Sequence, residues 1–377
     1  MTKRRVVVVG AGLGGVTLAR VLQVHGVAVE VLEAEPSAAA RTQGGMLDIH
    51  EESGQVALRA AGLYERFLTK VHTGGQAMRV LDERATVLHE ETDDSAGGRP
   101  EIDRGDLRAL LLGSLAEGTV RWGGKVVGAT SLGDGRHAVA LADGGTVEAD
   151  LLIGADGAWS RIRPLLTPAV PAYTGISFVE VDLLDADRAH PTAATLVGGG
   201  MFFALGTGRA MLAHRETDGS LHVYVAVPAE VGWLATIDFA DPATSRSAVL
   251  REFDGWSEDL RDRVRDADGP LVPRLIHALP VDHGWPREPG VTLLGDAVHL
   301  MSPFAGEGAN LAMHDAAELA RALVEHPDDT EAALAAYESD LFPRSRAAAA
   351  DSAANMALMF GPNAARVMAD FFTGARP

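Results

Sequence analysis

The hydrophobic pattern of the chain opens with four consecutive valines, Val6 to Val9. An unbroken apolar run of this kind is typical of a parallel strand that is buried on both faces. Apolar residues at helical spacing follow over Val16 to Val24, and a second apolar run extends from Val27 to Leu32. The pattern predicts a strand, a helix and a second parallel strand, which together form one βαβ unit.

The rest of the first half alternates between helical and strand-like patterns. These patterns predict a helix at 53–68, two short strands within 76–91 and a second helix at 99–115. A three-stranded meander follows at 125–132, 137–141 and 146–153. The two short strands look like an excursion away from the first core. The second helix, which Arg104 opens, returns the chain to that core.

A different pattern occupies residues 172–281, where strands of mixed polarity follow one another. The predicted strands are YTGISFVEVDLL, AATLVG, MFFALG, RAMLAHRE and SLHVYVAVP. Two short helices come after them, one of which opens at Asp241-Pro242. This segment predicts a largely antiparallel sheet that is separate from the first unit.

The end of the chain returns to a buried strand, Val291 to Leu294, and a helix from about residue 308 to 324. A long alanine-rich helical region, 330–372, follows. The predicted fold class is therefore α/β, with a Rossmann-like nucleotide domain, a second sheet and a long C-terminal helix. A sheet laid against a nucleotide domain makes a cleft, and such clefts are preferred ligand sites.

The glycines of the first turn point to a dinucleotide. Gly10, Gly12 and Gly15 form a G-x-G-x-x-G sequence directly after the first strand. In such a turn the first glycine permits the bend, the second lets the backbone approach a pyrophosphate and the third lets the helix pack on the strand. Glu33 ends the second strand, where a carboxylate accepts hydrogen bonds from a ribose and repels a 2′-phosphate. We therefore expect NAD or the ADP half of FAD in this groove, rather than NADP.

Composition and charge narrow the class of partners. The length of 377 residues suggests two domains, and the lack of cysteine excludes disulfides, thiolate metal sites and thiol nucleophiles. The formal net charge of −19 argues against nucleic acid and against an anionic membrane face. No apolar run approaches the length of about eighteen residues that a membrane span needs. We therefore expect a cytoplasmic protein that acts on a small molecule and needs no metal.

Two further strand ends carry carboxylates. Asp156 and Asp296 each follow a buried strand, and α/β folds bind ligands at the carboxyl ends of their strands. Asp156 is equally compatible with a turn that its own side chain caps. His299 has no serine or metal partner nearby in the sequence, so we interpret it as a packed, hydrogen-bonded histidine. Arg41, in the loop after the second strand, is compatible with a phosphate contact and with a solvated surface charge.

Three strand-end motifs occur in the order GxGxxG, GADGxxSxxR and GDAxHxxxPxxGxGxN. In this order they resemble the class A flavoprotein monooxygenases, the family of para-hydroxybenzoate hydroxylase. The stretches GGMLDIH, RPEIDRGDLRALLL and LLGDAVHLMSPFAGEGAN look most like the tetracycline-inactivating monooxygenases within it. The resemblance implies a GR2-type domain that binds FAD non-covalently through Gly10, Gly12, Gly14, Gly15, Glu33, Arg41, Arg104, Asp156, Asp296, Pro303, Gly306, Gly308 and Asn310.

The resemblance also implies roles and domain boundaries. Asp156 would lie near the pyrophosphate and the path of the nicotinamide cofactor, Asp296 would bind the ribityl chain, and the turn from Pro303 to Gly308 would flank the isoalloxazine. The FAD-binding domain would comprise residues 1–72, 99–171 and 282–340, and the substrate-binding domain residues 73–98 and 172–281. A C-terminal helix, 341–377, would bridge the two.

A substrate pocket follows from the same comparison of motifs. Its predicted lining is Glu180, Met201, Phe203, His222 and Phe304, each of which is also a plausible packing residue. Glu180 and Met201 replace the Gln and Arg that the tetracycline-inactivating enzymes present to their substrate, whereas His222 is kept. Because buried polar groups need matched partners, these replacements argue against tetracycline itself. Ala34 also replaces an arginine that is frequent in the family.

The activity that the resemblance implies is aromatic hydroxylation. NADPH or NADH would reduce the flavin, O2 would add to it as a C4a-hydroperoxide, and one oxygen atom would pass to a planar polycyclic or phenolic molecule, tetracycline-like or an aromatic polyketide. No side chain acts as a nucleophile in this scheme, although Glu180 or His222 could take a phenolic proton. The protein is expected to be a monomer or a weak homo-oligomer.

Two other functions remain open. A flavin-dependent halogenase would share the FAD domain, but none of the five tryptophans forms the W-x-W pair expected of that class. A non-catalytic flavoprotein would sequester a planar ligand without consuming NADPH. A plain NAD dehydrogenase is disfavoured, since it would leave Asp156 and residues 295–310 without a role.

Overall fold

The computed structural model describes residues 4–40, 44–72, 74–93 and 98–374. Its first layer is a five-stranded parallel sheet in the order β17 (Val291–Leu293), β11 (Leu151–Gly154), β1 (Val6–Val9), β2 (Val29–Leu32), β7 (Val120–Arg121). The central strand β1 is buried along its whole length, which explains its four valines. The predicted βαβ unit is confirmed, and the carboxyl ends of β1, β11 and β17 meet at one edge.

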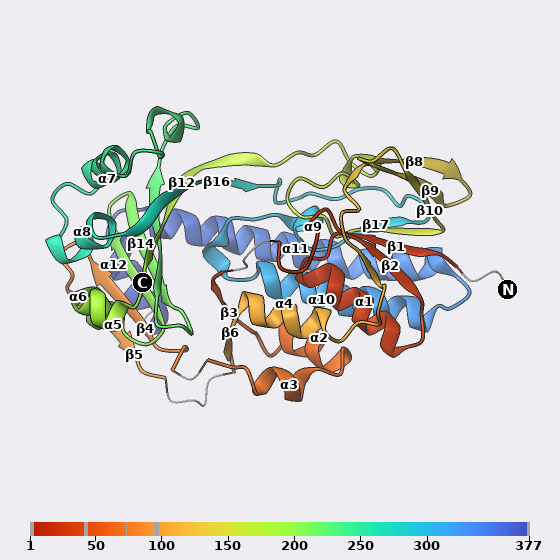
Figure 1. The fold of residues 1–377 in the computed structure, drawn as a ribbon, viewed down its shortest axis with the longest axis horizontal. Helices are drawn as coiled ribbons and strands as arrows, with labels where there is room; N and C mark the ends of the chain where they lie inside the picture. Colours follow the sequence, from red (N-terminus) through yellow and green to blue (C-terminus); the bar gives the residue numbers. More distant parts are fainter. Residues whose placement is uncertain (1–3, 41–43, 73, 94–97, 375–377) are drawn as a thin grey trace.

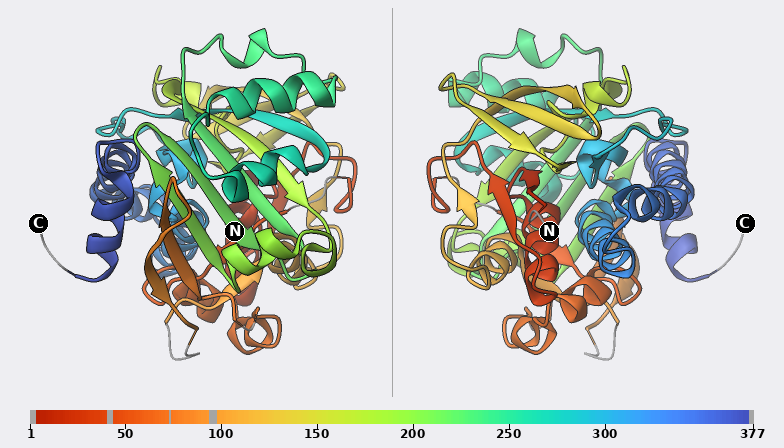
Figure 2. Two further views of the ribbon diagram at one scale, coloured as in Figure 1. Left: turned by 90° about the vertical axis from the view of Figure 1, so that its left-hand side faces the viewer. Right: turned by 90° about the vertical axis from the view of Figure 1, so that its right-hand side faces the viewer.

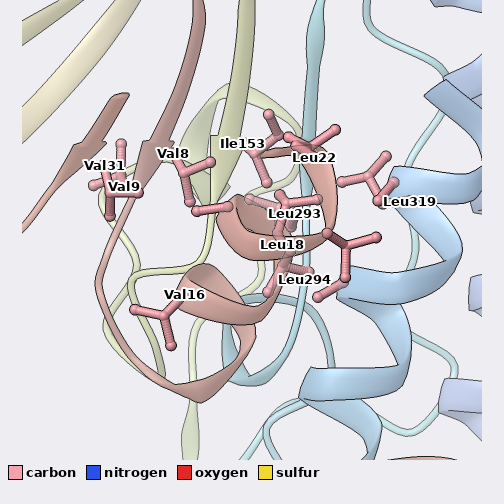
Figure 3. Close-up of a cluster of buried hydrophobic side chains, with 14 of the residues drawn as sticks. Val8, Val9, Val16, Leu18, Leu22, Val31, Ile153, Leu293, Leu294 and Leu319 are labelled. Carbon is pink, nitrogen blue, oxygen red and sulfur yellow. The ribbon is translucent and has the colours of Figure 1, made fainter. Parts of the chain in front are cut away.

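This parallel sheet lies between two layers (Figure 1). Helices α1 (Leu13–Val24) and α10 (Gly308–Glu325) cover one face, and an antiparallel meander, β8 (Val126–Gly133), β9 (Arg136–Leu141) and β10 (Thr146–Ala149), covers the other. Figure 3 shows Leu18 and Leu22 of α1 and Leu319 of α10 gathered beside Ile153 and Leu293. The carboxyl edge of the sheet is thereby held on a rigid core.

The second sheet has seven strands. Its order is β16 (Asp268–Ala278), β12 (Ala172–Leu183), β15 (Leu221–Pro228), β14 (Arg209–Arg215), β13 (Met201–Gly206), β4 (Met78–Asp82), β5 (Val87–Glu91). Only the β13–β4 pair is parallel, so the prediction of a largely antiparallel sheet is confirmed. One face packs on α5 (Ala186–Ala189), α6 (Pro191–Val197), α7 (Pro242–Arg251) and α8 (Glu258–Arg265). The other face is covered in part by α12 (Ala364–Phe372).

A small ribbon and a long helix connect these layers. The ribbon pairs β3 (Met46–Asp48) with β6 (Glu101–Asp103). The helix α11 (Thr330–Met359) packs on α10 and continues into α12, and both C-terminal helices lie together at one side of the molecule (Figure 2). The domain boundaries given above, including a bridging helix from residue 341, stay predictions. Among the described helices, none combines the length and apolar character that a membrane span requires.

Three predicted helices were drawn too long. The helix expected at 53–68 is two helices, α2 (Gly54–Ala60) and α3 (Tyr64–Leu68), because Gly62 between them has a φ of +66°. The helix expected at 99–115 begins with strand β6, and α4 (Arg104–Leu112) follows after Asp103 caps it by accepting from the Asp106 nitrogen. The region 330–372 is divided between α11 and α12 at Asn363, which has a φ of +56°.

Two strand predictions also need correction, and strand β16 was missed. AATLVG was expected to be a strand and is helix α6, because Pro191 occupies the first position of that helix. The strand expected at 146–153 is two strands, β10 and β11, separated at Asp150, whose side chain accepts from the Arg5 nitrogen at 2.8 Å. Strand β16 was not predicted, since two prolines and a glycine interrupt its pattern, which an edge strand tolerates.

Candidate active site

The glycine-rich turn after β1 is packed against the end of β11. Gly10 has a φ of +106°, and a Cβ atom added there would lie 2.3 Å from the carbonyl oxygen of Ala155. A Cβ atom on Gly15 would lie 2.0 Å from the carbonyl oxygen of Gly10. Both positions require glycine, and this close packing brings the second motif, which begins at Gly154, against the first.

The space beside Gly12 is open. A Cβ atom added there would meet no atom of the described residues within 4 Å. Gly12 is the N-cap residue of α1, and no side chain caps that helix. The free N–H groups and positive dipole end of a helix attract anions. This turn therefore has the room and the donors that a pyrophosphate needs.

Gly14 joins the first motif to the third. A Cβ atom on Gly14 would lie 2.6 Å from Cδ1 of Leu294 and 2.9 Å from the carbonyl oxygen of Ala312. Helix α1 therefore packs closely on the end of β17 and on α10. Three motifs that are far apart in the sequence are neighbours at one edge of the parallel sheet.

Glu33 lies beside the same turn at the end of β2. Its Oε2 accepts from the Ala11 nitrogen at 2.7 Å, and its Oε1 accepts from the Glu35 nitrogen at 2.9 Å. These bonds orient the carboxylate. Each oxygen keeps a further lone pair, with which it can accept from a ribose hydroxyl.

A buried arginine on α4, Arg108, also contacts the turn and was missed in the sequence. Its Nε donates to the Ala11 carbonyl at 3.1 Å, and its Nη1 donates to the Ala38 carbonyl at 3.2 Å. A cavity of about 530 Å³ opens beside it, lined by α4, the segment after α4 and Trp122. Arg108 could have been recognised in the sequence, because it is a cation on the otherwise apolar face of its helix, four residues after Arg104.

Arg104 and Arg41 are the two other predicted cofactor cations. Arg104 is exposed at the first position of α4, and its backbone nitrogen donates to the Gly45 carbonyl at 3.0 Å. Burial raises the pKa of Tyr224 on β15 to about 12, and the charge of Arg104 acts against that shift. Arg104 therefore stands between the β3–β6 ribbon and the large sheet. Arg41 lies outside the described residues, so both of its interpretations stay open.

Asp156 caps its own turn, which is one of the two roles weighed for it, and its role in ligand binding stays a prediction. Its Oδ2 accepts from the Arg161 nitrogen at 2.6 Å, which makes it the cap of its own turn. Its Oδ1 is buried and has no hydrogen-bond partner within the described ranges. Burial raises the pKa of Asp156, and the bonds with Ser160 and Arg161 oppose that shift. One carboxylate oxygen is thus bonded to its own turn, and the other has no partner among the described residues.

Asp296 is exposed at the start of α9 (Asp296–His299), and its carboxylate has no hydrogen bond or ion pair in the described part of the chain. Arg163 fixes the turn that carries it. The Nε of Arg163 donates to the Ala297 carbonyl at 2.7 Å, and its Nη2 donates to the carbonyls of Asp296 at 3.1 Å and Ala158 at 2.8 Å. Arg163, the last residue of the second motif, therefore holds the second and third motifs together.

Replacing Arg163 by alanine is expected to weaken FAD binding at least tenfold and to lower the free energy of unfolding by about 3 kcal/mol. The substitution leaves four carbonyl oxygens, those of Gly157, Ala158, Asp296 and Ala297, without their buried donor and frees the turn that carries Asp296. FAD titration and denaturant unfolding of the variant measure the two effects. The matched control is Arg161→Ala, whose side chain is exposed two residues earlier. Equal losses in both variants would mean that Arg163 does not position the turn.

The turn before α10 presents a free helix end. Pro303 opens a single 3-10 turn (Pro303–Ala305), Gly306 has a φ of +69°, and α10 begins at Gly308. Within the described ranges, no atom lies within 4 Å of a Cβ atom added to Gly308, and no side chain caps the helix. The partial positive charge of this helix end is therefore directed at open space.

Asn310 holds the β3 segment against that helix end. Its Oδ1 accepts from the His50 nitrogen at 3.0 Å, and its Nδ2 donates to the Asp48 carbonyl at 2.8 Å. The buried His50 ring lies between two carboxylates, 2.8 Å from Asp48 and 3.2 Å from Glu307. Burial lowers the pKa of His50, but the two carboxylates outweigh burial and raise it to about 9. A protonated His50 thus ties β3 to the start of α10.

His299 is packed and hydrogen-bonded, which confirms the prediction. Its Nε2 lies 2.6 Å from Oδ2 of Asp315, and both side chains are buried. Asp315 also accepts from the Gly295 nitrogen at 3.1 Å and from Nη2 of Arg344 at 2.9 Å. The buried His299–Asp315 pair, together with the half-buried Arg344, supports the backbone directly before Asp296.

Four of the five residues predicted to line the substrate pocket share one face of the large sheet. One row of side chains crosses that face, because each of its residues is paired with the next on the neighbouring strand. From β12 through β15 and β14 to β13, the row is Asp182, His222, His214 and Met201. Glu180 and Phe203 lie two residues from members of this row, so they point to the same side. This face is directed toward the β3–β6 ribbon, since a Cβ atom added to Gly45, directly before β3, would lie 3.6 Å from the Tyr224 hydroxyl.

The fifth residue, Phe304, comes from the turn before α10 and reaches the sheet through aromatic contacts. Its ring centroid lies 5.8 Å from that of Phe178 on β12, and Phe178 lies 5.6 Å from Tyr224. Phe360 contacts Phe304 from the other side at 5.5 Å. The free end of α10 and the sheet therefore meet across a group of aromatic rings. Phe178 and Tyr224 were missed, although their even spacing from Glu180 and His222 places them on this face.

The two candidate proton acceptors differ in their partners. Nδ1 of His222 lies 2.6 Å from Oδ1 of Asp182, and Nε2 has no partner in the described segments. Glu180 is paired with Arg274, whose Nε lies 3.0 Å from Oε1. Burial lowers the pKa of His222, but the neighbouring Asp182 outweighs it and raises the pKa overall. Nε2 of His222 is thus the available proton acceptor.

These observations fit FAD. The open space at Gly12 suits a pyrophosphate, the unpaired carboxylate of Asp296 suits the hydroxyls of a ribityl chain, and the uncapped start of α10 suits an electron-rich ring edge. Among the described residues, no atom lies within 4 Å of the position of a Cβ atom at Gly12 or at Gly308.

Comparisons with known proteins agree with this geometry. The family described as FAD binding domain matches residues 3–230 and 283–352. "Monooxygenase asqM" of Emericella nidulans is 31% identical over 97% of each chain. Among solved structures, Klebsiella pneumoniae HpxO, complexed with FAD and uric acid, has a TM-score of 0.81 at 23% identity and covers 98% of this chain and 92% of its own. The tetracycline destructase Tet(55) has a TM-score of 0.75 at 22% identity, with coverages of 99% and 95%.

The fold and the site define a flavin-dependent monooxygenase of class A, with FAD as its cofactor. The chain belongs to the FAD binding domain family. The resemblance drawn from the three motifs is thereby confirmed. The individual cofactor and substrate residues stay predictions.

Proposed function

We propose that the protein uses NADPH or NADH and O2 to hydroxylate a planar phenolic or polycyclic small molecule. The observation that carries this proposal is the aromatic contact between Phe304, at the free end of α10, and Phe178, on the polar face of the large sheet. A planar ring can pack against such a group of aromatic side chains. The polar groups of the sheet face can then orient its hydroxyls.

The proposed FAD-binding residues are the glycine-rich turn, Glu33, Asp156, Asp296 and the turn from Pro303 to Gly308. Bound FAD supplies the activation of O2 for transfer of one oxygen atom. The chain itself orients the substrate, excludes water with its aromatic side chains and places the positive end of α10 where negative charge develops. His222 takes the proton of a ring hydroxyl at Nε2, and Asp182 holds its ring in the required tautomer.

The substrate class follows from the polar face. Tet(55) is a tetracycline destructase and HpxO was complexed with uric acid, so both neighbours support a planar substrate for this chain. Glu180 and Met201 present a carboxylate and a thioether where tetracycline-inactivating enzymes present an amide and a cation. We therefore infer an aromatic polyketide or another tetracycline-like compound, with recognition different from that of tetracycline.

An absorbance spectrum of the purified protein, followed by NADPH and NADH oxidation with a panel of polycyclic phenols, tests the proposal. We expect a flavin spectrum, reductant consumption that rises with one compound, and a product heavier by one oxygen atom. Tight ligand binding without any turnover would contradict the proposal, because this is the behaviour of a sequestering flavoprotein. A chlorinated or brominated product in the presence of halide would instead favour a halogenase.

A further inference from the structure

A buried carboxyl group without a partner lies on the β3–β6 ribbon. Glu101 is 6% exposed, and its Oε2 accepts no hydrogen bond in the described part of the chain. In the ribbon, Glu101 is directly opposite Asp48, and Asp103 is opposite Met46. Because side chains alternate along a strand, Asp48, Glu101 and Asp103 share one face of the ribbon. Leu47 and Ile102, on the other face, pack into the core of the parallel sheet.

The acidic face of the ribbon looks toward the polar face of the large sheet. Tyr224 of that sheet approaches Gly45, directly before β3. His214 lies on β14, and Glu216 follows directly after that strand, which ends at Arg215. Glu101 interacts electrostatically with Glu216, and His214 with Asp48, so the two faces are close neighbours.

Between the ribbon and the large sheet, two further polar atoms are buried without a hydrogen-bond partner, as Oε2 of Glu101 is. Oε1 of Glu216 and Nδ1 of His214 are buried and have no hydrogen-bond partner within the described ranges. Buried polar atoms in folded proteins nearly always have partners, so three exceptions in one layer point to a ligand group that supplies donors. All three atoms can act as acceptors, provided that His214 is neutral. Burial lowers the pKa of His214 to about 4, which keeps it neutral.

The charge of the layer decides which donor fits. Burial, together with the charge of Asp48, raises the pKa of Glu101 to about 8, and burial raises the pKa of Glu216 to about 7. A bound cation would relieve both effects, whereas a bound anion would strengthen the repulsion. A metal ion is a poor fit, because it needs ligand atoms at about 2 Å and the described residues contain no group of three His, Asp or Glu side chains that could hold one. An ammonium nitrogen reaches its acceptors at about 2.9 Å, so it tolerates a wider arrangement of the three atoms. An organic N–H cation matches both the charge and the three acceptors.

We propose that the substrate carries a basic nitrogen, which binds as an ammonium group between Glu101, Glu216 and His214. This inference deepens the proposed function, on which it rests for the position of the substrate on the polar sheet face. Met201, directly opposite His214 across the sheet, would then contact the carbon framework next to the nitrogen. The three residues select the substrate and take no part in the oxygen transfer.

Binding of two matched probes to the FAD-loaded protein tests the ammonium subsite. Serotonin and hydroxytryptophol are planar phenols of the same ring system, and they differ in an ammonium against a hydroxyl group. We expect serotonin to bind at least tenfold more tightly, as measured by calorimetry or by quenching of flavin fluorescence. In the double variant E101Q/E216Q, this preference should disappear. The isosteric replacements keep the shape of both side chains.

The control variant is E148Q, on β10 and far from this layer, which should keep the tenfold preference. Equal binding of the two probes to the unmodified protein, or no binding of either, would overturn the proposal. So would a preference that survives in E101Q/E216Q. Because these measurements involve no turnover, they separate the subsite from the proposed function. An ammonium preference without any hydroxylation would retain the subsite and reject the reaction.

Discussion

The Gly12→Val variant is expected to lose FAD binding by a factor of at least 100 while its apoprotein keeps the stability of the original chain. Gly12 has an ordinary φ of −73°, and an added Cβ atom would meet no other atom within 4 Å. A valine side chain therefore fits the free protein but fills the space that a pyrophosphate must enter. Flavin content after purification, FAD titration and thermal unfolding of the apoprotein measure both parts of the prediction.

A second glycine in open space provides the control for that variant. Gly128 on β8 also has no atom within 4 Å of an added Cβ, but it lies on the meander, away from the glycine-rich turn. Gly128→Val should retain both stability and FAD affinity. FAD affinity within threefold of the original in Gly12→Val would show that the pyrophosphate lies elsewhere. A large fall in apoprotein stability would instead contradict the open space described at Gly12.

Much of the nucleotide-binding fold could be predicted because its elements follow simple periodicities. The run Val6–Val9 and the glycines after it determine strand, turn and helix almost without tertiary context. Predictions failed where one residue changed a local pattern. Pro191 turned an apolar segment into helix α6, and Gly62 divided a helix that the apolar spacing had made continuous.

The motifs of the candidate site could be predicted from the sequence. The contacts that hold these motifs in place could not. A carboxylate after a strand, such as Asp296, can be recognised in the sequence because the strand itself can be recognised. Arg163 could not be assigned its role in this way, since its acceptors are carbonyl oxygens that any residue provides. The pairing of Asp182 with His222 depends on the register between β12 and β15, which the alternation of each strand alone does not define.

Replacing His222 by asparagine is expected to lower kcat for hydroxylation of a phenolic substrate about 100-fold, with little change in FAD affinity. In the proposed reaction the neutral ring takes the phenolic proton at Nε2, so asparagine removes the base while keeping a polar side chain beside Asp182. Substrate-dependent O2 consumption and product formation measure kcat, and FAD titration measures the cofactor. His25→Asn, at an exposed position after α1, is the control and should keep full activity.

Asp182→Asn separates a catalytic His222 from a merely structural one through pH dependence. His222 acts as a base only when unprotonated, so kcat of the original protein should rise with pH through the pKa of His222. The negative charge of Asp182 raises that pKa. Its removal should therefore move the rise in kcat to lower pH and reduce the plateau about tenfold, because the imidazole becomes less basic and loses its fixed tautomer. In Asp182→Asn, a lower plateau without any shift of the pH profile would mean that Asp182 only supports the sheet. In His222→Asn, an unchanged pH profile would mean that another group accepts the proton.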